Sequence, residues 1–318
     1  MGPGVSVLVN NKLDIKGTAD KHVTILPLDP EGLPWGTFSV VLASDTSNVS
    51  YLTVSGGSEA WVDGIYLSGQ LNFYSSDVNF DHLTVRNALA DDGLNVKNAI
   101  TNISNSTFEG NSSDAFDGDW VSAVIKNSVF TDNKGDGADF SGSLVVIRES
   151  ILNSMGDKGV SAGENSKVTI YNSIIEDNEI GVASKDLSAV DVYASVLAQN
   201  GQAISLYQKK AIFGPGYAKV YGALVLDNET DFFVEKKSVL TLFGTGIASL
   251  PDSEGVIANN PKILTDEQIA LARNYRDYKA LSDAQRDTYG VGPKTPSVNV
   301  LGEQIPDLSS RSLWPTLQ

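Results

Sequence analysis

A short pattern of residues recurs along the middle of the chain at an almost constant interval. Isoleucine, asparagine, serine, phenylalanine and a second asparagine follow one another with the same spacing at Ile103–Asn111 and at Ile125–Asn133. Weaker copies begin at Ile147, Ile170 and Val192, so the steps are 22 residues (103 to 125 and 125 to 147), 23 (147 to 170) and 22 (170 to 192). Self-similarity at such a period predicts a stack of equivalent units, each covering the core of its neighbour.

Apolar and polar residues alternate within each unit, as they do in β-strands. A second alternating stretch precedes the copies, for example at Leu94/Val96 and at Ala138/Phe140. A unit of about 22 residues is too short for a strand–helix–strand motif, so each strand has to pair with its counterpart in the next unit. The sequence therefore predicts an all-β chain folded as a right-handed parallel β-helix. Two internal ladders are expected, one of Ile103, Ile125, Ile147, Ile170 and Val192 and one of Phe108, Phe130, Leu152, Ile175 and Leu197.

Asparagine recurs at two positions of the repeat. One set is Asn105, Asn127 and Asn172, and the other is Asn111, Asn133, Asn178 and Asn200. Stacked asparagines can hydrogen-bond along the axis of a solenoid, and asparagine tolerates the left-handed backbone of tight bends. Both sets are therefore predicted to mark the corners between strands.

The chain is expected to divide into three segments. Residues 1–45 are predicted to form an N-terminal cap with the first strands, residues 46–260 the β-helix, and residues 261–318 a helical cap and tail. Capping-box patterns at Thr265 and Ser282 predict two short helices, at 265–278 and 282–288. Longer steps between copies, from 51 to 82 and from 192 to 220, predict two inserted loops, the second around residues 209–217.

Composition narrows the possible functions. The net charge of −16 argues against nucleic acid as a partner, because phosphate binding needs a basic surface. The chain has no cysteine, and its two histidines, His22 and His82, lie far apart, so a zinc site is not expected. The sequence contains no run of about 18 apolar residues, so a membrane-spanning helix is not expected. Residues 1–4 do not resemble a targeting segment, and we expect a secreted or cell-surface protein whose targeting segment is not in this chain.

The repeats resemble those of the pectin-lyase-like family of right-handed β-helix proteins. Four segments, Asp91–Asn98, Asp114–Asp119, Gly156–Ser161 and Ser184–Ser188, are also similar to β-helix modules of large bacterial surface proteins that carry spore-coat-type kinase domains. The resemblance covers roughly residues 20–245 and implies the fold. The wider family includes pectate lyases, polygalacturonases, alginate epimerases and phage tailspikes. Its catalytic signatures, such as Gly-His-Gly, are absent here, so the resemblance implies no particular activity.

Strand alternation assigns the side chains that point away from the core. Leu94 and Val96 are expected to point inward, so Asn95 and Lys97 point outward. Steps of 22 residues carry these positions into two outward columns. The first is Asn95, Asp117, Asp139, Ser161, Ala183 and Ser205, and the second is Lys97, Asp119, Ser141, Gly163, Lys185 and Tyr207. Ser161, Gly163 and Ala183 are predicted to line a shallow groove between an acidic end and a Lys185/Tyr207 end, with Trp120 available to stack on a sugar ring.

The acidic end of these columns is the candidate site. Two carboxylates about 5 Å apart repel one another by roughly 3 kcal/mol at an effective dielectric constant of 20. A Ca²⁺ ion held by Asp117, Asp119 and Asp139 would relieve this repulsion, and so would a shared proton. The alternative is that these three aspartates form only a solvated acidic face. Asp117, Asp139 and Lys185 are the candidate catalytic residues, with Lys158 as another possible base. A further column, Asp92, Asp114, Asp136, Asp157 and Glu179, is interpreted as structural, because aspartate is an ordinary turn residue.

Two functions remain open at this stage. The first is an extracellular β-helix that binds a polysaccharide along its outer face, with ligand contacts from Asn95, Lys97, Asp119, Trp120, Ser161, Gly163, Lys185 and Tyr207. If it is an enzyme, it is a polysaccharide lyase or a glycoside hydrolase. The alternative is a non-catalytic structural or adhesin module of a larger bacterial surface protein. A monomer is expected, because a tailspike-like trimer needs an exposed apolar stripe and none is visible.

Overall fold

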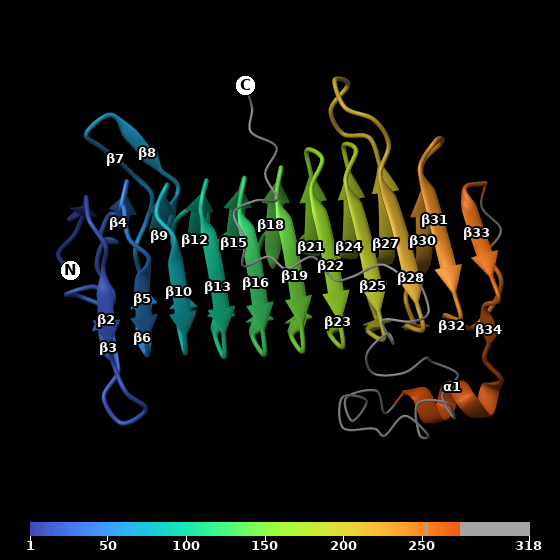
Figure 1. Ribbon diagram of the computed structural model, residues 1–318. Coiled ribbons are helices and arrows are strands. Elements are labelled where there is room, and N and C mark those ends of the chain that lie inside the picture. The colour runs from blue at the N-terminus through green and yellow to red at the C-terminus, as the bar shows by residue number, and fades with distance from the viewer. Residues whose placement is uncertain (252–253, 274–318) are drawn as a thin grey trace.

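The computed structural model describes residues 1–251 and 254–273. Three long parallel sheets run side by side along the molecule, and the chain visits each of them once per turn (Figure 1). Sheet 1 contains β1 (Val7–Val9), β4 (Phe38–Val41), β9 (Gly69–Tyr74), β12 (Asp92–Lys97), β15 (Asp114–Asp119), β18 (Ala138–Ser141), β21 (Lys158–Gly163), β24 (Ile180–Lys185), β27 (Gln202–Tyr207) and β30 (Thr230–Val234), in that order.

The other two sheets follow the same order along the axis. Sheet 2 contains β2 (Asp14–Lys16), β5 (Ser47–Ser50), β10 (Val78–Asp81), β13 (Ile100–Ser104), β16 (Ser122–Lys126), β19 (Leu144–Arg148), β22 (Lys167–Tyr171), β25 (Ala189–Tyr193), β28 (Tyr217–Tyr221), β31 (Val239–Phe243) and β33 (Val256–Asn259). Sheet 3 contains β3 (Val23–Ile25), β6 (Leu52–Ser55), β11 (Thr84–Arg86), β14 (Thr107–Glu109), β17 (Val129–Thr131), β20 (Ile151–Asn153), β23 (Ile174–Glu176), β26 (Val196–Ala198), β29 (Leu224–Leu226), β32 (Gly246–Ile247) and β34 (Lys262–Ile263).

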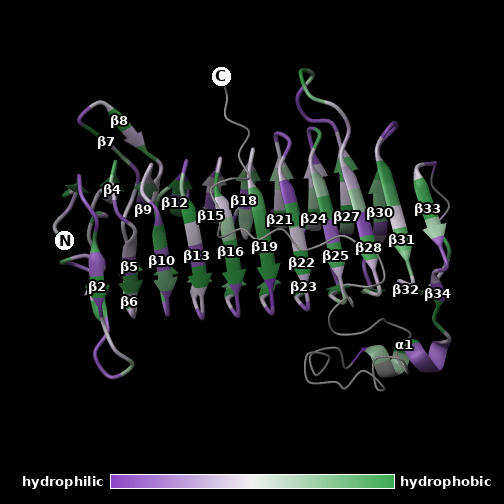
Figure 2. Cartoon of the chain, viewed as in Figure 1, coloured by the Kyte–Doolittle hydropathy of each residue, from purple (hydrophilic) through white to green (hydrophobic). Residues whose placement is uncertain are grey.

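The core is built from residues that stack on their equivalents in the next turn. Both predicted ladders are confirmed: Ile103 pairs in register with Ile125, and Phe108 with Phe130, and the pairing continues through the later members to Val192 and Leu197. The rings of Phe108 and Phe130 are parallel, with centroids 4.5 Å apart. Figure 2 shows hydrophobic and hydrophilic residues alternating along the strands, which places one side of each strand in the core.

The asparagine ladders form the corners, as predicted. Two residues connect sheet 2 to sheet 3 in these turns, and the first of them has a left-handed backbone, with φ of 52° at Asn105, 49° at Asn127 and 45° at Asn172. The side-chain amide of Asn127 donates to Asn105 over 2.7 Å. In the second ladder, the amide of Asn178 donates to Asn200 over 2.9 Å. Each side chain therefore satisfies a neighbour one turn away, which keeps the turns in register.

The two predicted insertions are present at different corners. Residues 60–67 form an antiparallel hairpin of β7 (Ala60–Val62) and β8 (Ile65–Leu67) before β9. The second insertion lies between β27 and β28 and contains residues 208–216. Both leave the pairing of the flanking strands intact, because Thr53 still pairs with Thr84 and Val192 with Val220.

A short helix, α1 (Asp266–Ala272), follows the last strand. Its predicted capping box is confirmed. The backbone N–H of Gln268 donates to the Thr265 hydroxyl, and the backbone N–H of Thr265 donates to Oε1 of the Gln268 side chain. Ile269 and Ala272 pack on an apolar strip of sheet 3 that includes Val196 and Leu224. The end of the predicted helix at 265–278, the predicted helix at 282–288 and the tail lie outside the described residues. Within the described part of the chain, no helix is long and apolar enough to cross a membrane.

We predict that Phe130→Ala lowers the free energy of unfolding by about 3–5 kcal/mol, because it removes a fully buried ring and leaves a cavity between two turns. Denaturant unfolding measures the change. Lys126→Ala is the matched control, because Lys126 is exposed on the preceding strand, and its effect should stay within about 0.5 kcal/mol. Equal effects of the two substitutions would contradict the ladder.

Candidate functional site

The outer face of sheet 1 brings the candidate residues together. The β-pairing aligns Asn95 with Asp117, Asp117 with Asp139, and Asp139 with Ser161. The second outward column is also in register, since Lys97 pairs with Asp119 and Lys185 with Tyr207. Adjacent members of a column are therefore one strand spacing apart, about 4.8 Å. Both columns were correctly assigned from the alternation.

The predicted open groove over the small residues is wrong. Ser161 and Ala183 have no exposed surface, and Gly163 is also buried. The side chain of Lys185 lies over them, and a Cβ atom added to Gly163 would stand 2.9 Å from Lys185 Cε. A tryptophan at position 163 would therefore meet the lysine and not solvent. The small residues make room for a long side chain that folds back along the face.

Lys185 itself is buried, which was not expected of a lysine on an outward column. Its Nζ donates to Ser161 Oγ over 2.7 Å and lies 3.6 Å from Asp139 Oδ1. Only 5% of the side chain is exposed. Because a buried ammonium needs compensating partners, the contacts with Asp139 and Ser161 offset the cost of burying this side chain.

Three carboxylates converge on the same face, and they are not the three that the sequence indicated. Oxygens of Asp114, Asp136 and Asp139 all lie within 4.8 Å of one another, and we refer to these three residues as the carboxylate cluster. Asp119 points elsewhere, because its carboxylate pairs with Lys97 Nζ at 3.1 Å. Asp117 accepts a hydrogen bond of 2.7 Å from Asn95.

Sequence analysis had interpreted Asp114 and Asp136 as turn residues. Asp114 is the first residue of β15 and Asp136 lies two residues before β18, but oxygens of both side chains lie close to the carboxylate of Asp139. The Asp114 side chain accepts the N–H of Asp136 over 2.7 Å. Gly135 is needed beside it, because an added Cβ would stand 2.1 Å from Asp114 Oδ1. The available signal was the 22-residue step from Asp92 to Asp114 to Asp136, which repeats an acid where a turn needs none.

Burial and neighbouring negative charge raise the pKa of the aspartates on this face. Burial is the main cause in each case. It raises the pKa of Asp114 to about 8, with the charge of Asp136 adding to the effect. The pKa of Asp92 is raised to about 7 and that of Asp136 to about 6. The pKa of Asp117 also lies well above its ordinary value. The protein can therefore hold protons here at neutral pH.

Lys158, predicted as a possible base, is held as a cation. Burial lowers the pKa of its amine, but the charges of Asp136 and Asp157 and a hydrogen bond to Asp157 outweigh this, so the pKa is raised. Its Nζ lies 3.2 Å from Asp136 Oδ1. An ammonium with a raised pKa cannot accept a proton near neutral pH, so Lys158 does not fit a general base.

The remaining predicted ligand residues are divided between the face and its edge. The Asn95 amide joins Asp117 to Asp92, and Asn95 Oδ1 is buried with no hydrogen-bond partner. Lys97 lies over the ring of Tyr74, with Nζ 5.3 Å from its centroid. Burial raises the pKa of the half-buried Tyr207. Trp120 lies beyond the end of β15, at the turn into sheet 2, and does not point into the cluster.

The carboxylate cluster has the chemistry that a hard divalent cation requires. Ca²⁺ binds carboxylate oxygens at about 2.3–2.6 Å, so two ligands on opposite sides of the ion are about 5 Å apart. The mutual limit of 4.8 Å between the three oxygens is compatible with this spacing. Seven aspartates lie among three lysines here, namely Asp92, Asp114, Asp117, Asp119, Asp136, Asp139 and Asp157 among Lys97, Lys158 and Lys185. The uncompensated charge has to be neutralised by protons or by a cation.

Comparison with known proteins agrees with the fold. A family model described as a right handed beta helix region matches residues 92–214. The solved structure of the periplasmic alginate epimerase AlgG is similar, with a TM-score of 0.54, 12% identity, and coverage of 82% of this chain and 71% of that one. A mutant of the same epimerase gives a TM-score of 0.56 at 11% identity, with the same coverage. Pectate lyase Pel9A gives 0.49 at 16% identity, covering 93% of this chain and 80% of that one.

The chain is therefore a right-handed parallel β-helix protein. No curated protein matches its sequence significantly. The narrower resemblance to modules that accompany spore-coat-type kinase domains stays a prediction.

The raised pKa values predict that the cation-free protein loses stability as the pH rises. The folded-state pKa values of about 6 to 8 exceed the value of about 3.9 expected in the unfolded chain. The folded state therefore binds more protons between about pH 4 and 8, and the free energy of unfolding falls across that window. In chelator, the melting temperature at pH 8 should lie several degrees below that at pH 5.

Asp114→Asn isolates this effect, because asparagine imitates the protonated carboxyl group and can still accept the N–H of Asp136. Its melting temperature should match the wild type at pH 5 and exceed it at pH 8. Asp45→Asn, at an exposed position, should follow the wild type at both pH values. A wild-type melting temperature that is flat or rises across the window would contradict the buried, protonated cluster.

Proposed function

We propose that the outer face of sheet 1 binds a divalent cation, Ca²⁺ in the first instance, at Asp114, Asp136 and Asp139, and through it an acidic polysaccharide. The observation that carries the proposal is the convergence of three carboxylates, whose oxygens lie within 4.8 Å of one another, from two neighbouring turns at an extended face. This cluster replaces the set of Asp117, Asp119 and Asp139 as the expected metal ligands, because Asp119 is engaged by Lys97.

An acidic polymer fits this face only when a cation is present. Without it, the cluster repels a carboxylate ligand, and the nearby ammonium groups of Lys158 and Lys185 are already paired with Asp136 and Asp139. Ca²⁺ takes six to eight oxygen ligands, so three protein carboxylates leave positions for sugar carboxylates and hydroxyls. A cation would also loosen the hold of Asp139 on Lys185, which would free the ammonium to contact the polymer.

Polymers of uronic acids are the first ligands to test. Alginate is such a polymer, and an alginate epimerase is among the solved structures that share this fold. That epimerase is periplasmic, and we likewise propose that this protein acts outside the cytoplasm. Fold similarity alone does not determine a ligand, so the proposal depends on the cluster.

A structural module is the second candidate, and one observation favours it. Each of the three lysines on this face already has an aspartate partner, in the pairs Lys97–Asp119, Lys158–Asp136 and Lys185–Asp139. A face whose lysines are all paired can have the structural role of keeping neighbouring turns in register. The two candidates differ in whether the cluster takes a cation.

Calcium titration followed by calorimetry tests the proposal. We predict that the wild type binds Ca²⁺ and that the bound ion raises the melting temperature at pH 8. The double variant Asp136→Asn with Asp139→Asn should lose the binding, while Asp45→Asn keeps it. Alginate and polygalacturonate should then bind the wild type in Ca²⁺ and not in chelator.

The outcomes separate the candidates. If the wild type takes up no Ca²⁺, or if the double variant binds it equally well, the face is a structural one. If the polymers bind, the release of unsaturated products, followed by ultraviolet absorbance, shows whether binding leads to cleavage. Lys185→Met then tests Lys185 as a catalytic residue. A variant that binds Ca²⁺ but no longer cleaves the polymer would show that Lys185 takes part in the reaction.

A further inference from the structure

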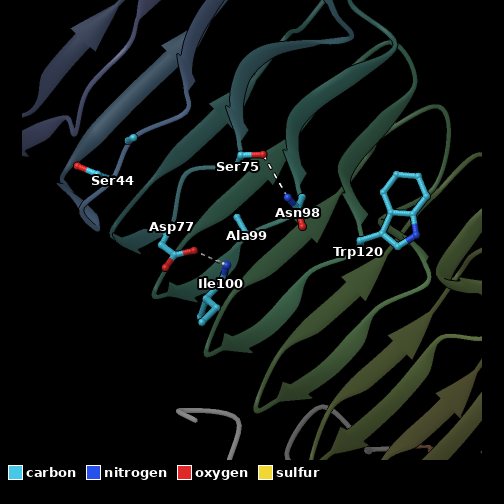
Figure 3. A pocket seen from close by; sticks show the side chains of 8 residues that line it. Ser44, Ser75, Asp77, Asn98, Ala99, Ile100 and Trp120 are labelled. Carbon is cyan, nitrogen blue, oxygen red and sulfur yellow. Dashed lines mark hydrogen bonds between the residues drawn. The ribbon is translucent and has the colours of Figure 1, made fainter. Parts of the chain in front are cut away.

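A recess lies at the corner between sheet 1 and sheet 2, away from the carboxylate cluster. Figure 3 shows the hollow, which has a volume of about 490 Å³. Ala43, Ala99 and Ile100 give it an apolar floor, and Ser44, Ser75, Asp77 and Asn98 place hydroxyl, carboxylate and amide groups around it. Trp120 lines one end of the hollow, and its indole extends away from the other labelled residues, toward Gly142 on the next turn (Figure 3).

Successive turns contribute equivalent residues to this corner. Leu42, Ser75, Asn98, Trp120 and Gly142 each follow the end of a sheet 1 strand, and each donates its backbone N–H to the next turn. The two bulky members, Leu42 and Trp120, are 72% and 57% exposed. Leu42 and Trp120 are three strand spacings apart along the axis, about 14 Å. Only the short polar side chains of Ser75 and Asn98 lie between them. The corner is therefore a row of short polar side chains that ends at an exposed aromatic residue.

Trp120 is an unfavourable residue for its backbone. Its φ is 51°, in the left-handed region, where asparagine and glycine are preferred and a bulky side chain is disfavoured. The adjacent turns follow that preference, with Asn98 on one side and Gly142 on the other. Packing in the core does not require the ring, because more than half of the residue is exposed. Gly142 supports it from behind, since an added Cβ would stand 2.8 Å from Trp120 Cδ1.

We propose that this hollow is a second carbohydrate-binding site, which takes an uncharged pyranose unit stacked against Trp120. An exposed aromatic ring next to hydroxyl, amide and carboxylate groups is suited to a sugar ring, which has one apolar face and a polar rim. The residues that line the hollow include Asp77 and no lysine or arginine, so an acidic sugar is disfavoured. The site does not depend on the cation proposed for sheet 1.

Calorimetry and saturation-transfer NMR with neutral oligosaccharides test the site on the full chain. The probes are cellohexaose, mannohexaose, xylohexaose and maltohexaose at millimolar concentration, in the presence of chelator. At least one of them should bind the wild type. Trp120→Asn should weaken that binding by at least about tenfold, and Trp120→Phe, which keeps an aromatic ring, should stay within about threefold of the wild type.

The choice of asparagine guards against a trivial loss of binding. Asparagine occupies the same corner one turn earlier and tolerates the left-handed backbone, so Trp120→Asn should melt at the wild-type temperature or above. Trp61→Ala is the matched control, because Trp61 is 73% exposed on the β7–β8 hairpin and does not line the hollow. It should bind as the wild type does.

The result can overturn the site independently of the cation proposal. If none of the four probes binds, or if Trp120→Asn binds as tightly as the wild type, the hollow is not a carbohydrate site and Trp120 only covers Gly142. Binding that disappears in chelator, or in the Asp136→Asn with Asp139→Asn variant, would assign the neutral sugar to sheet 1 instead.

Discussion

Every turn of this molecule lies directly on its own equivalent, and the remaining features follow from that constraint. In-register parallel pairing places a residue about 4.8 Å from the residue at the same position of the next turn. Identical neighbours are favourable when they are flat rings or amides, as for Phe108 on Phe130 or Asn105 on Asn127. Identical neighbours are unfavourable when they are charged. The same geometry that builds the core therefore makes a column of aspartates costly.

The outer face of sheet 1 shows how that cost is met. Two ionised carboxylates about 5 Å apart repel by roughly 3 kcal/mol at an effective dielectric constant of 20, and burial removes the water that would screen them. Lys158 follows Asp136 on the next strand and neutralises one end of the column. Asp92 and Asp114 have no such partner beside them among the ion pairs of the described residues, and burial first and neighbouring negative charge second raise their pKa values. Protonation relieves it at low pH, and a divalent cation would relieve it at neutral pH.

The repeat determined the fold from the sequence, but it determined only part of the site. Alternation identified the inward ladders and both outward columns, because the side-chain period of a strand is two. It could not show that Lys185 folds back over Gly163, because the direction of a long flexible side chain depends on which partners lie within its reach. Asp114 and Asp136 were misjudged for a related reason: a residue at the edge of a strand has no fixed alternation, and its direction depends on the shape of the turn.

The outer face and the corner place different demands on the residues that occupy them. On the face, each outward position is flanked by its equivalents on both sides, so a long side chain such as Lys185 lies down and becomes buried. At the corner, the left-handed backbone turns the side chain away from the sheet, and Leu42 and Trp120 remain exposed although they are bulky and apolar. On the outer face of sheet 1, burial therefore shifts the pKa values of charged groups. At the corner, an aromatic ring remains accessible to solvent. A solenoid can vary either set without changing the ladders inside it, because the outward residues do not contribute to the stacking of the core.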